Sequence, residues 1–272
     1  MITYHEVKRD VSHFCSYLLE RLRREGVAQF AVKSGKKIIS LTKENSVSRR
    51  IDDLEFDRRF GTDTAASIPA WKLSDVPSGN RVHATNYVAS HEKHVLMLFR
   101  MLPIQPEDYA FVDLGSGKGK VLLLAAEYGF TRIVGVEFSP SLHAIAQANI
   151  GRYKSVCARK CSIDSVCQDA ADWPIPSEKL VLFLYGPFHE PVFRSVVARL
   201  RQSLETHDRP VFLVNFGVPL VEAIRKIDFL HPLPGEAGQW IYSNKAIAPP
   251  QELEQTRTSS RPTRFSSAIG GH

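Results

Sequence analysis

Between residues 109 and 243, short apolar segments alternate with segments of helical period, and this pattern constrains the fold more than any other feature. Parallel strands need helical crossovers, so the alternation predicts a doubly wound, Rossmann-like α/β fold. We expect a seven-stranded, mostly parallel sheet with an antiparallel closing strand, preceded by an N-terminal helical extension. The expected strands cover 109–114, 132–137, 162–167, 180–185, 210–215, 229–230 and 239–243, and the expected helices cover 120–128, 141–150, 191–204 and 218–227.

The rest of the chain divides into three parts around this core, which spans residues 103–248. Residues 1–60 predict a helical or mixed extension, with one amphipathic helix over 5–25 and a mixed, polar stretch after it. Residues 61–102 predict a loop and a helix over 90–102 that cover the cofactor and the substrate. Residues 249–272 have almost no apolar content, which is typical of a disordered tail.

A glycine-rich turn, Gly115-Ser116-Gly117-Lys118-Gly119, follows the first core strand. Glycines let the backbone approach a ligand closely, and NAD-binding proteins also use such turns. A dinucleotide fingerprint, however, requires Gly or Ala at the position that Lys120 occupies. Asp113, just before the turn, would repel a pyrophosphate and attract a cationic amino group. The turn therefore favours an adenosyl ligand with an amino-acid tail over NAD(P).

Acidic residues also end the second and third strands. Glu137 stands about twenty residues after the turn, where a carboxylate accepts hydrogen bonds from ribose hydroxyls. Phe138 beside it is expected to pack on an adenine face. Asp169, next to Ala170, is the candidate for the adenine amino group, with Asp164 and Asp172 as alternatives.

Three stretches together resemble the successive motifs of class I S-adenosylmethionine-dependent methyltransferases: 112–119, 135–139 and 168–170. The segment 60–64, Phe-Gly-Thr-Asp-Thr, makes the chain most similar to bacterial members related to DOT1-type protein lysine methyltransferases. The resemblance implies S-adenosylmethionine as the cofactor and a methyltransferase activity. The predicted cofactor site comprises Asp113, Gly115, Ser116, Gly117, Gly119, Glu137, Phe138, Asp169 and Ala170.

The acceptor site is less defined by the sequence. Amine-methylating members of the resembling class carry Asn or Asp where this chain has Gly186, so the usual side-chain acceptor is missing. The candidates for contact with the acceptor are Tyr87, Tyr185, Pro187 and Phe188. Asp63, His83, His91 and His189 are candidate general bases, and no spacing selects one of them.

Composition bears on partners and compartment. The formal charge is +6, but the basic pairs in the first sixty residues lack interleaved aromatic residues, which favours a solvated helix face over a nucleic-acid surface. The resemblance to protein lysine methyltransferases implies a protein acceptor, with a nucleic-acid methyltransferase or a non-catalytic cofactor-binding regulator as alternatives. The spacing of Cys157, Cys161 and Cys167 predicts free thiols and no metal site. Without a secretion signal or a membrane-spanning apolar run, the sequence predicts a cytoplasmic protein that does not bind membranes. It predicts no particular oligomeric state.

Overall fold

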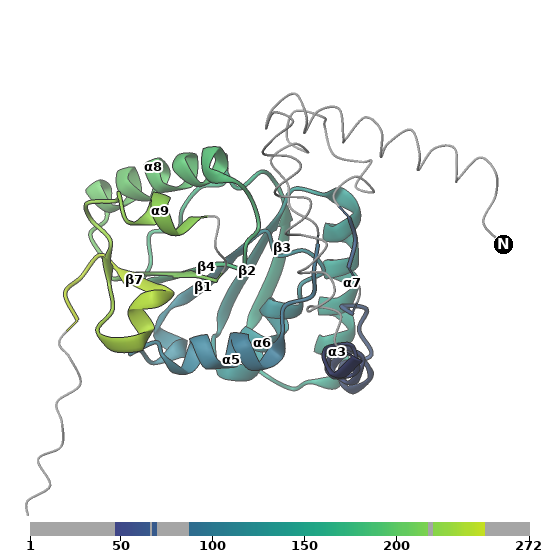
Figure 1. Ribbon diagram of the computed structural model, residues 1–272. Coiled ribbons are helices and arrows are strands. Elements are labelled where there is room, and N and C mark those ends of the chain that lie inside the picture. Colours follow the sequence, from purple (N-terminus) through teal and green to yellow (C-terminus); the bar gives the residue numbers. More distant parts are fainter. Residues whose placement is uncertain (1–46, 66, 70–86, 217–219, 248–272) are drawn as a thin grey trace, which may run out of the picture.

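The computed structural model describes residues 47–65, 67–69, 87–216 and 220–247. Its centre is a seven-stranded sheet in the order β3-β2-β1-β4-β5-β7-β6 (Figure 1). The first five strands of this order are parallel, and β7 runs antiparallel to both β5 and β6, so the predicted fold class is confirmed. The strands are β1 Ala110–Leu114, β2 Arg132–Glu137, β3 Ser162–Cys167, β4 Leu180–Leu184, β5 Val211–Asn215, β6 His231–Pro232 and β7 Ile241–Ser243.

Helices cover both faces of the sheet. In Figure 1, α8 and α9 lie above it, α5 and α6 lie below it, and α3 and α7 lie at the β3 edge. The helices are α3 Val47–Phe60, α5 Glu92–Arg100, α6 Lys120–Tyr128, α7 Pro140–Val156, α8 Glu190–Thr206 and α9 Val221–Ile224. Short 3-10 turns occupy Pro106–Asp108 and Gly235–Gln239. In the part of the chain that the structure describes, no helix combines the length and apolarity needed to cross a membrane.

The central strands are buried on both sides, and alternate residues serve opposite faces. Phe111 and Phe183 point into the layer beneath α5 and α6, whereas Val112 and Leu182 point toward α8. A strand with period-two alternation places successive side chains on opposite faces, so continuous apolar runs are needed where helices cover both. This explains why β1, β4 and β5 are apolar without interruption except at Asp113 and Asn215.

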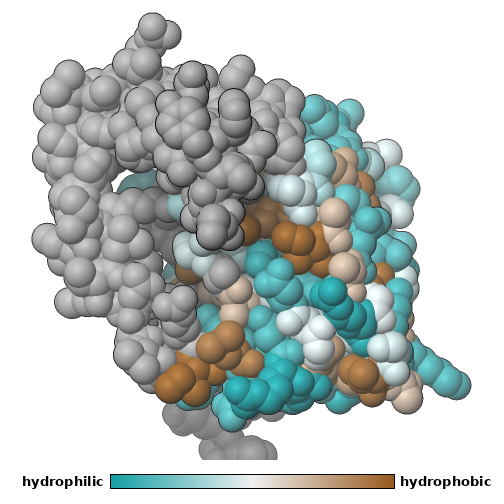
Figure 2. Space-filling model, turned by 90° about the vertical axis from the view of Figure 1, so that its right-hand side faces the viewer, coloured by the Kyte–Doolittle hydropathy of each residue, from teal (hydrophilic) through white to brown (hydrophobic). Residues whose placement is uncertain are grey.

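The structure differs from the expected elements at several places. Helix α3 lies in a stretch that was predicted to be mixed and polar. Among its described side chains, the buried apolar ones are Phe56 and Phe60, while Ile51 and Leu54 are about half exposed, so the helix has little apolar period. Figure 2 views the side that carries α3 and α7, where apolar patches are separated by polar side chains.

The other differences concern element ends. Helix α7 continues six residues beyond its predicted end at 150, since Tyr153 is buried in the core and extends the buried face of the helix. Helix α9 has four residues in place of the predicted ten. Strand β6 begins two residues later than predicted, and Leu230, which was expected in the strand, is buried just ahead of it. The predicted helix over 90–102 spans residues 92–100. The predictions for 5–25 and 249–272 lie outside the described residues.

The order of the strands determines where a ligand binds. From β1 the chain builds outward through β2 and β3, and it then returns to place β4 and β5 on the other side of β1. At such a reversal the loops at the carboxyl ends of neighbouring strands part and leave a crevice. The glycine turn after β1 and the loop after β4 therefore face one another at this edge of the sheet.

Candidate functional site

A cleft lies at the carboxyl edge of the sheet, where a ligand of an open α/β fold is expected to bind. The structure brings most of the predicted site residues together here. Those that line the cleft are Tyr87, Asp113, Gly115, Ser116, Gly117, Glu137, Phe138, Asp169, Ala170, Tyr185, Pro187 and Phe188. Gly119 is not among the lining residues. A Cβ at Gly119 would lie 3.3 Å from the Ala146 Cβ, so this glycine permits α6 to pack on α7.

The glycine turn has the backbone that its sequence requires. Gly115, Gly117 and Gly119 have φ values of 81°, 55° and 83°, in the left-handed region that other residues rarely adopt. A Cβ at Gly115 would lie 2.3 Å from the Pro187 Cβ, so the loop after β4 closes directly over the turn. Ser116 is buried beneath, and its Oγ has no hydrogen-bond partner in the described structure. The turn thus combines close backbone approach with an unsatisfied polar group.

Asp113 occupies the floor of the cleft and is only 3% exposed. Burial, with a smaller contribution from the negative charge of Glu137, raises the pKa of Asp113 to about 8. A buried carboxyl group with no cation beside it retains its proton, because the charged form loses hydration that nothing replaces. A cationic ligand group would supply that missing partner.

Glu137 holds the glycine turn against the end of β2. Its Oε2 accepts a hydrogen bond of 2.7 Å from the Gly117 N–H, and its Oε1 accepts one of 2.9 Å from the Ser139 N–H. The side chain is 3% exposed and borders the cleft. Glu137 therefore joins the glycine turn to the end of β2 at the wall of the cleft.

The structure separates Asp169 from its two alternatives. Asp169 lines the cleft, and its Oδ1 accepts a hydrogen bond from the Ala171 N–H. Asp164 is exposed on β3 and binds the Ser162 hydroxyl, whereas Asp172 pairs with Arg199. Only Asp169 is therefore placed to contact a ligand, beside the apolar surface of Phe138 and Leu142.

Tyr87 closes the cleft on the side of the glycine turn. Its hydroxyl donates a hydrogen bond of 2.8 Å to the Thr64 carbonyl, and burial raises the pKa of this phenol well above its ordinary value. A Cβ at Gly117 would lie 2.4 Å from a Tyr87 ring carbon, so the ring packs on the bare backbone. Tyr87 is thus a wall of the site, and its hydroxyl is held by the segment after α3.

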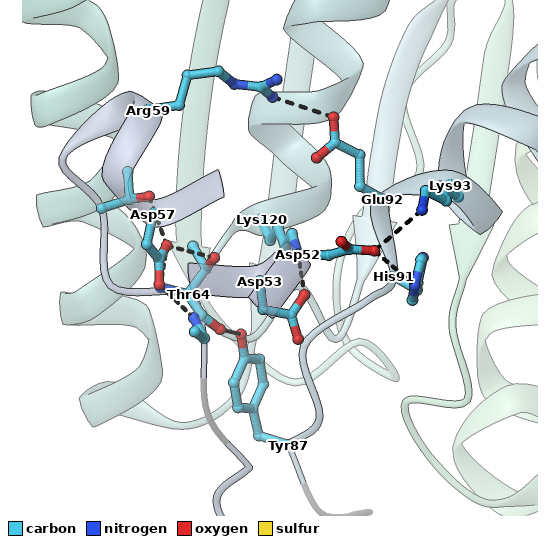
Figure 3. Close-up of polar contacts among 12 residues, drawn as sticks. Asp52, Asp53, Asp57, Arg59, Thr64, Tyr87, His91, Glu92, Lys93 and Lys120 are labelled. Atoms are coloured by element: carbon cyan, nitrogen blue, oxygen red, sulfur yellow. Dashed lines mark hydrogen bonds and ion pairs between the residues drawn. The ribbon is translucent and has the colours of Figure 1, made fainter. Parts of the chain in front are cut away.

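The end of α3 and that segment, together residues 53–65, form polar contacts that the sequence did not predict (Figure 3). The Asp57 carboxylate accepts hydrogen bonds from the backbone N–H groups of Thr64 and Ala65 and from the hydroxyls of Thr62 and Thr64. Asp53 and Asp57 are four residues apart, a spacing that puts both on one helix face with Phe56. This periodic signal was present in the sequence, but too few apolar residues accompanied it.

On the other side of the cleft, Tyr185 belongs to an aromatic stack. Its ring lies 4.9 Å from that of Phe216 at an interplanar angle of 20°, and Phe216 also neighbours Trp240 and His94. Gly186 follows with a φ of 60°. The stack fixes the Tyr185 ring at the mouth of the cleft, next to Pro187.

Of the candidate bases that the structure describes, none lines the cleft. Asp63 pairs with Lys118, and His91 lies at the start of α5 with its Nε2 3.6 Å from Asp52. His189 precedes α8, and His83 lies outside the described residues. Cys157, Cys161 and Cys167 are free thiols, and among the described residues no group of three potential ligands would hold a metal ion.

Replacing Gly117 with alanine tests the contact between the turn and Tyr87. We expect a loss of about 2–4 kcal/mol in the free energy of unfolding, from overpacking and from the left-handed backbone. Gly61→Ala is the matched control, since Gly61 has a φ of 66° and nothing within 4 Å of its added Cβ. Chemical denaturation should show a clearly larger loss for Gly117→Ala, and equal losses would contradict the packing argument.

Comparison with known proteins agrees with this geometry. Residues 111–207 match the family model described as a methyltransferase domain. The match covers about a third of the chain, which has the Rossmann-like fold described above, and a methyltransferase domain implies S-adenosylmethionine as the cofactor. No curated protein matches the chain.

Solved structures with similar folds include an RNA methyltransferase from Salinibacter ruber in complex with S-adenosyl-L-homocysteine. It is 23% identical, with a TM-score of 0.37, and the match covers 57% of this chain and 92% of that one. Another is the Pyrococcus abyssi tRNA (uracil-54, C5)-methyltransferase, at 12% identity and a TM-score of 0.38, covering 57% and 38%. A geranyl diphosphate C-methyltransferase from Streptomyces coelicolor is 13% identical, with a TM-score of 0.36 and 45% of each chain covered.

Proposed function

We propose that this protein transfers a methyl group from S-adenosylmethionine to a protein side chain that enters the cleft beside Tyr185 and Pro187. The observation that carries the proposal is the convergence of Asp113, Glu137 and Asp169 on one cleft, over a glycine turn. Tyr185, Pro187 and Phe188 border the same cleft and supply an apolar, aromatic mouth for the acceptor. The relation to DOT1-type enzymes is part of this proposal.

The residues of the cleft fit the cofactor in a defined direction. The buried carboxyl of Asp113 would receive the ammonium of the methionine part, and Glu137 would accept hydrogen bonds from the ribose hydroxyls. Phe138 and Leu142 would pack on the adenine, with Asp169 near its amino group. The backbone at Gly115 and Gly117 would lie against the part of the cofactor between its methionine ammonium and its ribose.

In this orientation the protein contributes position more than acid–base chemistry. When bound, S-adenosylmethionine would supply an electrophilic methyl group, whose bond to sulfur would break with its electron pair left on sulfur as the acceptor's lone pair forms the new bond. Pro187 and the stacked ring of Tyr185 would align the acceptor with that bond. Among the residues that the structure describes, no candidate base lines the cleft, and the proposal requires an amine acceptor to enter without its proton.

A transfer assay tests the proposal. Labelled S-adenosylmethionine is incubated with the full chain and cell-extract fractions pretreated with protease or nuclease. Protease-sensitive label that is lost with Asp113→Asn would support a protein acceptor. Nuclease-sensitive label would favour the nucleic-acid alternative. Cofactor binding without transfer to any fraction would favour a regulatory protein, an alternative that the absence of a polar side chain at Gly186 motivates.

Gly186→Asn is expected to fold and to change the acceptor step. Asparagine tolerates the left-handed backbone, and an added Cβ would meet only the Phe216 carbonyl, at 3.9 Å. We expect a stability change within about 1 kcal/mol and, if the acceptor is an amine, a transfer rate raised severalfold at unchanged cofactor affinity. Single-turnover transfer and calorimetric cofactor titration measure the two. A fall in cofactor affinity would contradict the placement of Gly186 at the acceptor end.

A further inference from the structure

The glycine turn carries two lysines, Lys118 and Lys120, whose charge the proposed cofactor contacts do not use. A glycine turn that leads into a helix N-terminus attracts anions, and lysines at this position would strengthen that attraction. Without other charges, the turn after β1 would therefore suit a phosphate group. Lys120 also borders the cleft itself.

Both lysines are instead paired with aspartates from the segment 53–65. The Lys118 Nζ lies 2.8 Å from the Asp63 Oδ1, and the Lys120 Nζ lies 2.5 Å from the Asp53 Oδ1 (Figure 3 for the second pair). The two lysine side chains are only 4% and 2% exposed. The Asp53 side chain is 11% exposed and that of Asp63 is 57% exposed, so separation of the pairs would leave the two buried lysine charges without compensation.

The position of Asp63 is held independently of its carboxylate. Asn149 of α7 accepts a hydrogen bond from the Asp63 N–H, and its Nδ2 donates to the carbonyls of Asp63 and Lys118. These bonds involve backbone atoms of Asp63, so they persist when its side chain changes. A substitution of the Asp63 carboxylate therefore alters charge with little change in the path of the chain.

We propose that Asp53 and Asp63 determine the charge specificity of the cofactor cleft. By neutralising Lys118 and Lys120, they leave the cleft to the carboxylate of Glu137 and to the carboxyl of Asp113, which gives up its proton when a cationic group binds beside it. The cleft then selects the positively charged S-adenosylmethionine and rejects adenine ligands that carry phosphates. The inference rests on the proposed cofactor site and concerns which adenosyl ligand that site accepts.

The test compares dissociation constants for S-adenosylmethionine and ADP, measured by calorimetry on the full chain. In Asp63→Asn, a buried positive charge is left near the turn. We expect S-adenosylmethionine to bind roughly threefold to tenfold more weakly and ADP to bind more tightly by a similar factor. Lys118→Met should shift the ratio of the two constants in the opposite direction, which a general loss of structure cannot do.

Asp208→Asn is the matched control, because it removes the same charge from an exposed ion pair with Lys245 far along the chain. In this variant, the ratio of the dissociation constants for S-adenosylmethionine and ADP should equal the ratio in the unchanged protein. A ratio within twofold of the unchanged protein in both Asp63→Asn and Lys118→Met would overturn the inference. Failure of the unchanged protein to bind S-adenosylmethionine would instead overturn the proposed cofactor site.

Discussion

Asp113→Asn is expected to weaken binding of S-adenosylmethionine roughly a hundredfold or more while making the ligand-free protein more stable. The two effects have one cause. A carboxyl group buried without a cation destabilises the empty cleft, and the same group is the partner that a ligand ammonium requires. Asparagine keeps the shape of the aspartate side chain but carries no charge. It therefore removes both the destabilisation of the empty cleft and the attraction for the ligand ammonium.

The stability effect has a definite dependence on pH. The folded-state pKa of Asp113, about 8, lies above the ordinary value of 3.8, so the folded protein holds a proton that the unfolded chain releases. Its contribution to stability is complete below pH 4 and is lost as the pH rises toward 8. Asp113→Asn should flatten that decline and, at pH 8, raise the melting temperature by several degrees.

Cofactor binding should also depend on pH, with a maximum near pH 8. The complex holds one proton between the Asp113 carboxyl and the ligand amine, whose free pKa is also about 8. Below that pH binding releases a proton, and above it binding takes one up. Calorimetry in buffers of different ionisation enthalpy measures both the release and the uptake of protons on binding. A pH-independent affinity for the unchanged protein, or unchanged affinity in Asp113→Asn, would contradict the assignment.

Asp53→Ala is expected to have the largest effect on stability. It leaves the Lys120 ammonium, whose side chain is 2% exposed, without its partner at 2.5 Å. Breaking such a buried pair costs about 3–5 kcal/mol, whereas replacing both members by apolar residues of similar volume is often neutral. Urea denaturation should therefore show a large loss for Asp53→Ala and recovery of most of it in Asp53→Leu combined with Lys120→Met.

An exposed pair provides the control. Asp228→Ala breaks the ion pair with Arg201 on the surface, where such a pair contributes less than about 1 kcal/mol. If Asp53→Ala destabilises the protein no more than Asp228→Ala does, α3 does not depend on its ion pair with the turn. If the double replacement is as unstable as Asp53→Ala, the loss comes from packing against Phe56 and not from an unpaired charge.

The sequence predicted an element accurately where the residues that determine it lie close together in the chain. Strand β2 and helix α6 begin and end where predicted, because apolar period and the glycines at 119 and 129 mark their limits locally. Helix α3 was missed because its burial depends on Phe56 and Phe60 packing near Tyr153, far along the chain. Helix α9 and strand β6 are short, so their windows contained too few periodic positions to set their limits.

The sequence by itself determined the alternating sheet, the glycine turn and the carboxylates that end successive strands. These follow from period and from residues close in the chain, and parallel strands necessarily bring their carboxyl ends to one edge. Only the tertiary structure decided the charge of the cleft. Lys120 and Asp53 are 67 residues apart, and Lys118 and Asp63 are 55 apart. Pairing across such separations depends on how α3 packs against the core, and no local pattern encodes it.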